Sequence, residues 1–131
     1  MNTVMRLLIL LAAFYATEIS AQEIFSCEAR SVDVNTENLK SQSYEKFYPT
    51  IIINADNNSV SYVYTQHGMQ FKSYYRIEAQ TEDLLVGIEK WKPDYVSIIH
   101  IDKVSKKFNS FVSGTTMNYF GNTVTAGKCF N

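Results

Sequence analysis

The chain has 131 residues, with 12 basic and 13 acidic side chains, a formal net charge of −1 at pH 7 and two cysteines. This length suits a single domain. The balanced charge does not favour nucleic-acid binding, which calls for a clustered basic surface, so we expect no nucleic-acid partner.

The first 21 residues have the layout of a secretory signal peptide, with one positive charge at Arg6, an apolar run from Leu7 to Tyr15 and a small residue at Ala21. The apolar run is shorter than the roughly 20 residues that a transmembrane helix needs. We predict cleavage after Ala21, export to the periplasm or out of the cell, and a single mature domain over residues 22–131 without a transmembrane segment. An uncleaved membrane anchor is the minor alternative.

The two cysteines, Cys27 and Cys129, lie near opposite ends of this domain. In an oxidising compartment, two cysteines allow only one disulfide. Closing a loop of roughly 100 residues stabilises the fold by about 4 to 5 kcal/mol in the chain-entropy treatment. We therefore predict a structural disulfide between the first and last strands. A redox or metal role is the minor reading, because no CxxC spacing accompanies either cysteine.

After residue 22, the chain is rich in the residue types of strands and turns, and no stretch keeps apolar residues at helical spacing. The segment "EIFSCEARSVDV" predicts the first strand. Residues 34–47 are polar and predict a long loop with at most one helical turn. The segment "TIIINADNNSVSY" predicts a strand, a turn through residues 56–58 and a return strand.

The clearest local signal is "VSYVYTQHGMQFKSYYRI", residues 60–77. A two-residue turn at His67 and Gly68 predicts a β-hairpin in which Tyr64 faces Phe71. In this register, one face of the hairpin is largely apolar and the other largely polar, so the pattern itself supports the register. The predicted inward face carries Val60, Tyr62, Tyr64, Phe71, Tyr75 and Ile77.

Two further strands, over residues 84–91 and 95–102, flank a turn at Pro93 and Asp94. Both faces of this pair are apolar. Either the pair is covered on both sides, or one face is an exposed apolar patch that marks a binding surface. One face holds Leu84, Val86, Ile88, Val96, Ile98 and His100, and the other holds Leu85, Trp91, Tyr95, Ile99 and Ile101.

The segments "KFNSFVSG" and "NTVTAGKCF" predict the last two strands, which brings the count to about eight. Short connections favour an all-β antiparallel meander that closes into a small barrel, because closure leaves no edge unpaired. A two-sheet sandwich is the alternative. In the barrel, the disulfide joins the two strands at the closing seam.

The segment "IIHIDKVSKKFNSF", residues 98–111, followed by "AGKC", resembles a pattern in small exported bacterial β-proteins of uncharacterised function. In that pattern, a strand ends in an Ile-Asp-Lys/Arg turn, the next strand begins with Phe, and the chain ends in Gly-x-Cys. The resemblance implies an exported β domain and no activity.

Catalytic groups are few. His100 and Asp102 share a strand face and could orient an imidazole for base catalysis or help to bind a metal. No third ligand or nucleophile accompanies them, so we favour a hydrogen-bonding role at the end of the strand. His67 suits a turn. The sequence indicates no enzyme, no metal site and no cofactor, and it does not indicate an oligomeric state.

Aromatic and basic residues gather in the middle of the chain. Most of the aromatic side chains fit a core, but tyrosine, tryptophan and arginine are also favoured at interface hot spots. We predict a binding site at Tyr74, Arg76 and Trp91, and an exported binding module that recognises a protein partner, such as an inhibitor or immunity-type protein. The alternative is a small barrel that carries an apolar or lipid-like ligand.

Overall fold

The computed structural model describes residues 22–35, 38–92, 95–114 and 121–131. The predicted signal peptide and the turn at residues 93–94 lie outside these ranges. The described part of the chain is all-β and forms nine strands. The strands are β1 (Gln22–Asn35), β2 (Ser41–Ser43), β3 (Thr50–Asn54), β4 (Ser59–Gln66), β5 (Met69–Gln80), β6 (Leu84–Lys92), β7 (Tyr95–Asp102), β8 (Lys107–Gly114) and β9 (Gly121–Cys129).

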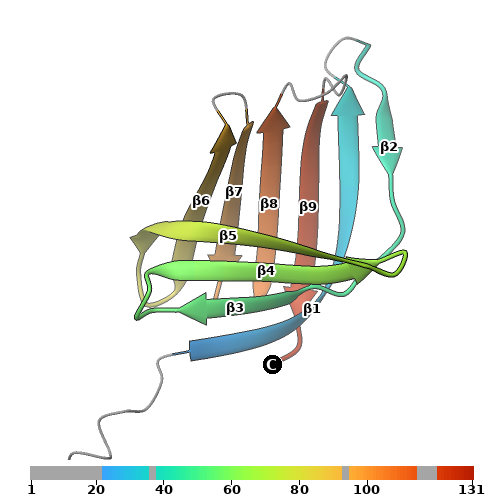
Figure 1. Ribbon diagram of the computed structural model, residues 1–131. Helices are drawn as coiled ribbons and strands as arrows, with labels where there is room; N and C mark the ends of the chain where they lie inside the picture. Colours follow the sequence, from blue (N-terminus) through green and yellow to red (C-terminus); the bar gives the residue numbers. More distant parts are fainter. Residues whose placement is uncertain (1–21, 36–37, 93–94, 115–120) are drawn as a thin grey trace, which may run out of the picture.

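Eight of these strands form a closed antiparallel barrel, and β2 adds to it from outside. The strand order is β2-β1-β3-β4-β5-β6-β7-β8-β9, and pairing of β1 with β9 closes the barrel. Strands β3, β4 and β5 form one layer that crosses in front of the layer formed by β6 to β9 (Figure 1). The prediction of a closed meander of about eight strands is confirmed.

The strand β1 bends so that it belongs to both layers (Figure 1). Its residues 22–26 pair with β3, and its residues 27–35 pair with β9. Cys27 lies directly opposite Cys129 at the start of the β1–β9 ladder, and the two form a disulfide. The predicted staple across the closing seam is therefore confirmed.

The segment at residues 34–47 differs from the predicted loop. Strand β1 continues to Asn35, and β2 then pairs with it through Ser43, Gln42 and Ser41. An isolated bridge between Ala29 and Phe47 extends this contact. Polar residues form strand here because the backbone pairs with an existing edge, a tertiary contact that composition does not reveal.

The β4–β5 hairpin has the predicted register, with Tyr64 opposite Phe71. Both turn residues have positive φ, 51° at His67 and 75° at Gly68, as the favoured two-residue hairpin turn requires. Asn58 also has a positive φ, and its side chain donates a hydrogen bond of 3.1 Å to the Ile77 carbonyl. The local turn chemistry therefore sets the register of this layer.

The core lies between the two layers and is mostly aliphatic. Its side chains alternate along each strand with outward-facing ones, which is the period expected for strands with one buried face. The most buried apolar side chains are Ile51, Ile53, Val60, Leu85 and Ile99. The rest of the core consists of Cys27, Ala29, Tyr62, Tyr75, Ile77, Ile101, Phe108 and Cys129.

Candidate functional site

The outer face of β6 to β9 carries a row of apolar side chains. Ile88 pairs with Ile98, Ile98 with Phe111, and Phe111 with Val124, so the row runs straight across four strands. Ile98, Phe111 and Val124 are 37%, 40% and 41% exposed, and Ile88 is half-buried. We name these four residues the outer strip.

The outer strip decides between the two alternatives that the sequence left open for residues 84–102. Leu85, Ile99 and Ile101 are buried, so the face that they share is the inner one. The opposite face, with Leu84 and Ile98, is open to solvent. One face of the pair is therefore an exposed apolar patch, and the next two strands extend it through Phe111 and Val124.

Two of the three predicted binding residues lie together at one end of this patch. A shallow depression of about 370 Å³ is lined by Tyr74 and Arg76 of β5 and by Ile88, Glu89 and Lys90 of β6. Tyr74 is 55% exposed. Because Ile88 belongs to both features, the depression is continuous with the outer strip. The side chain of the third residue, Trp91, lies outside the described part of the chain.

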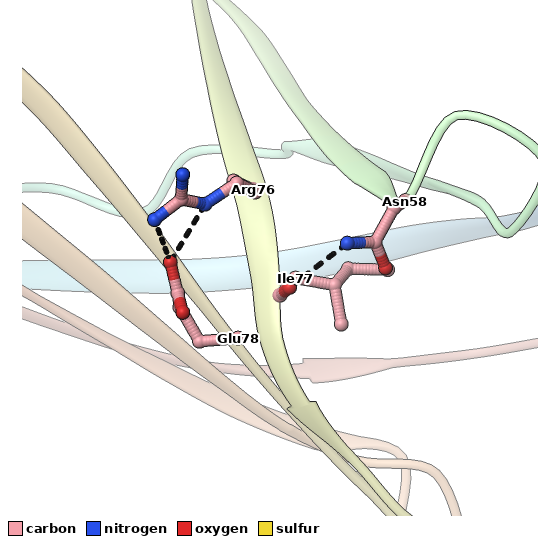
Figure 2. A network of polar contacts seen from close by, with 4 residues as sticks. All are labelled: Asn58, Arg76, Ile77 and Glu78. Atoms are coloured by element: carbon pink, nitrogen blue, oxygen red, sulfur yellow. Dashed lines mark hydrogen bonds and ion pairs between the residues drawn. The ribbon is translucent and has the colours of Figure 1, made fainter.

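Arg76 projects from the outer face of β5, on the side away from the core. Its guanidinium forms an ion pair with Glu78, in which Nε donates to Oε1 at 2.7 Å and Nη2 donates to the same oxygen (Figure 2). The Arg76 side chain is nevertheless 74% exposed, and such surface pairs contribute little to stability. The ion pair holds the guanidinium beside the depression and leaves most of it open to a partner.

The depression marks the place where β5 and β6 part. The last pair of the β5–β6 ladder is Arg76 with Ile88. Just beyond it, Glu89 is only 7% exposed and accepts hydrogen bonds from the Tyr74 backbone N–H and the Ser73 hydroxyl. Burial raises the pKa of Glu89, and these two hydrogen bonds partly oppose that rise.

Sequence reasoning did not single out Glu89. The signal was present, because Glu89 has the same strand parity as the inward-facing Leu85 and Gly87. A carboxylate on the buried face of a strand is unusual and indicates a specific polar contact, but the sequence did not say which face of this strand is buried. Its partner could not be predicted, because the parting of β5 from β6 is a tertiary feature.

Tyrosine hydroxyls lie inside the barrel near Glu89. The Tyr75 hydroxyl is 2.8 Å from the Ser97 hydroxyl. Burial raises the pKa of Tyr75 to about 12; the contact with Ser97 opposes this rise and the charge of Glu89 adds to it. Burial, followed by the charge of Glu89, also raises the pKa of Tyr95. These phenols therefore stay protonated at neutral pH and act as hydrogen-bonding groups.

His100 and Asp102 are placed at the end of β7, as the sequence indicated. Asp102 Oδ1 accepts hydrogen bonds from the backbone N–H groups of Val104 at 2.9 Å and Ser105 at 3.0 Å. The hydrogen bond from Ser105 is the largest influence that lowers the pKa of Asp102. The carboxylate thus holds the β7–β8 turn. Within the described ranges, no group of three potential ligands is placed to hold a metal ion.

A second groove, of about 800 Å³, lies beside the tip of the β4–β5 hairpin. It is lined by the segment 44–48, by Thr50, by residues 63–66 of β4, and by His67 and Gln70. Phe47 and Tyr64 pack together in its wall, with their ring centroids 5.0 Å apart. Sequence reasoning missed this groove because residues 44–48 reach β4 only in the folded chain.

No family model matches this chain, and no curated protein matches it significantly. The resemblance to small exported bacterial β-proteins therefore stays a prediction. Among the residues that the structure describes, no helix has the length and hydropathy to span a membrane.

Proposed function

We propose that this protein is an exported, non-enzymatic binding module that recognises a protein partner through the outer strip. The observation that carries the proposal is the row from Ile88 to Val124, in which three directly paired apolar side chains are each more than a third exposed. Contiguous apolar patches on small domains typically mark interaction sites. Export is supported by the leader-like N-terminus and the disulfide.

Charges around the outer strip indicate the chemistry of the partner. Lys107 and Lys128 are exposed and lie directly opposite each other on β8 and β9, and each also faces a carboxylate on its other side, Asp102 on β7 and Glu28 on β1. Arg30 is exposed on the same face of β1, whereas nearby Glu28 forms an ion pair with Lys46. A partner with an apolar contact surface and acidic neighbours would cover the strip and pair with these cationic side chains.

The depression at Tyr74 and Arg76 gives this surface an anchor point. It is concave and lies at the end of the strip, between an exposed tyrosine and two cationic side chains, Arg76 and Lys90. Aromatic and arginine side chains at such positions are typical interface hot spots. We therefore assign Tyr74 and Arg76 to the edge of the proposed interface.

The alternative, a carrier of an apolar ligand, has less support. In the described part of the interior, Tyr62, Tyr75 and Phe108 fill the space between the layers, with the Tyr62 and Phe108 ring centroids 5.8 Å apart. A carrier would need that space for its cargo.

Photo-crosslinking tests the proposal. A photoreactive phenylalanine analogue is placed at Ile98 and, in a matched control, at Leu39, an exposed apolar residue between β1 and β2. In envelope and secreted fractions of the source cells, we expect position 98 to crosslink one protein species and position 39 not to do so. The captured protein is then produced separately, and its affinity is measured by calorimetry.

With that purified partner, Phe111→Ser should weaken binding by about tenfold or more, because a central apolar contact is worth at least about 1.4 kcal/mol. The control Leu39→Ser should bind as the wild type does, and both variants should keep the wild-type unfolding transition. Equal crosslinking at the two positions, or unchanged affinity of Phe111→Ser, would overturn the assignment of the outer strip.

A further inference from the structure

The first half of β5 has a strand partner on one side only. Strand β4 pairs with β5 from Met69 to Arg76, but β6 pairs with it only from Arg76 onward. Among the described strands, none pairs with the other side of residues 69–75. Figure 1 shows this part of β5 running away from β6 across the front of the barrel. We name the segment Met69–Tyr74 the open edge.

Two hydrogen bonds show which backbone groups of β5 face the open side. The Ile77 N–H donates to the Asn58 carbonyl on the β4 side at 2.9 Å, whereas the Tyr74 N–H donates to Glu89 on the β6 side. Backbone groups alternate in direction along a strand. Gln70 and Lys72 therefore direct their N–H and C=O groups away from β4, toward the open side.

Glu89 limits the length of this edge. Its carboxylate occupies the Tyr74 N–H, which a neighbouring strand would otherwise use. An inward-pointing charge at the end of an edge is one way in which proteins stop a strand from pairing further. An added strand would thus pair with the five residues before Tyr74, a segment about 17 Å long at the usual rise per residue.

The two faces of the open edge differ in chemistry. On the inner face, Phe71 is exposed and stacks on Tyr64, with ring centroids 5.0 Å apart and an interplanar angle of 17°. On the outer face, the Lys72 ammonium lies 5.0 Å from the centroid of the Tyr74 ring, and Lys90 lies across the depression from Tyr74. Apolar side chains suit the inner face and acidic ones the outer face.

We propose that the open edge binds an extended segment of a partner protein by strand addition, with apolar and acidic residues alternating along that segment. The segment runs antiparallel to β5, with an acidic residue opposite Lys72 and an apolar one opposite Phe71. The open edge shares Tyr74 with the depression but contains no residue of the outer strip, and the inference does not depend on the partner proposed there. Two-fold pairing with a second copy, centred on Lys72, would set two lysines directly opposite each other, whereas an alternating partner segment meets Lys72 with a carboxylate.

The probe is the peptide acetyl-TVEVEVT-amide, added to the purified, oxidised protein. Because the Lys72 backbone groups face the open side, Lys72 and the residue opposite it form a hydrogen-bonded pair. The glutamate opposite Lys72, and the second glutamate two residues away, therefore direct their backbone groups toward β5. We expect the peptide to slow hydrogen exchange at the amides of Gln70 and Lys72. N-methylation of the glutamates should weaken binding by about tenfold or more. N-methylation of the valines, whose backbone groups face away, is the matched control and should change the affinity little.

Charge reversal tests the same edge from the protein side. Lys72→Glu should weaken peptide binding by about tenfold at low salt, whereas Lys40→Glu, an equal change in the loop between β1 and β2, should not. Equal loss with both methylated peptides, protection confined to other strands, or no binding would overturn the proposal. Concentration-dependent protection of Gln70 and Lys72 without peptide, together with dimers in sedimentation, would overturn it in favour of self-pairing.

Discussion

Replacing both cysteines by alanine should lower the free energy of unfolding by about 4 to 5 kcal/mol. The disulfide joins residues 102 positions apart, and for a loop of that length the lost chain entropy of the unfolded state is worth roughly 4.7 kcal/mol. This is a large share of the roughly 5 to 15 kcal/mol that stabilises a typical domain. The β1–β9 ladder, from Cys27–Cys129 to Asn35–Gly121, still pairs without the bond, so the fold should survive.

Urea unfolding followed by fluorescence measures this difference. The variant should show a lower midpoint and a larger slope, because an unfolded chain without a crosslink exposes more surface. Cys27→Ala alone is the control; it should lose as much stability as the double variant, since either change removes the link. A loss below about 1 kcal/mol would refute the reasoning, because it would mean that the unfolded chain already keeps its ends together.

Three further changes test individual packing and charge assignments by the same unfolding assay. Gly127→Ala should cost about 1 to 3 kcal/mol, since an added Cβ would meet the Phe108 ring and lie 2.7 Å from the Glu28 carbonyl; wild-type stability would contradict that close packing. Tyr62→Phe should add about 1 kcal/mol, because the buried Tyr62 hydroxyl has no hydrogen-bond partner within the described ranges; a loss of stability would show that the hydroxyl has one. Glu89→Gln should remove a pH dependence. Because burial raises the pKa of Glu89 in the folded state, the wild type should lose stability as pH rises from the ordinary carboxyl pKa through the raised one. The Glu89→Gln variant should not lose stability over this pH range. If the free energies of unfolding of the wild type and the variant changed with pH in parallel, the assignment of this pH dependence to Glu89 would be wrong.

Local chemistry made the β4–β5 hairpin predictable. His67 and Gly68 suit a turn with two positive φ values, and the apolar alternation on both sides admits one register. The inward face was also predicted, but one of its members, Phe71, is exposed. The reason is tertiary: Phe71 lies in the part of β5 that has already left β6, so the opposite layer does not cover it.

The outer strip was only half predictable. The sequence shows that both faces of residues 84–102 are apolar, but strand alternation alone cannot say which face meets the core. The closed barrel decides this, because it turns Leu85 and Ile99 inward and leaves Ile98 outside. The alignment of Ile98 with Phe111 and Val124 depends on the registers of β7, β8 and β9, which are contacts between strands and not properties of any one of them.

The sequence by itself determined the all-β class, the meander of short antiparallel connections and the single possible disulfide, because strand propensity, turn residues and a pair of cysteines are local or countable features. Only the tertiary structure decided where β5 leaves β6, and therefore why Glu89 is buried and why Tyr74 and Arg76 share a depression. The physical reason is that barrel closure fixes strand order, register and bending together, whereas alternation along one strand specifies only two faces and leaves their partners open.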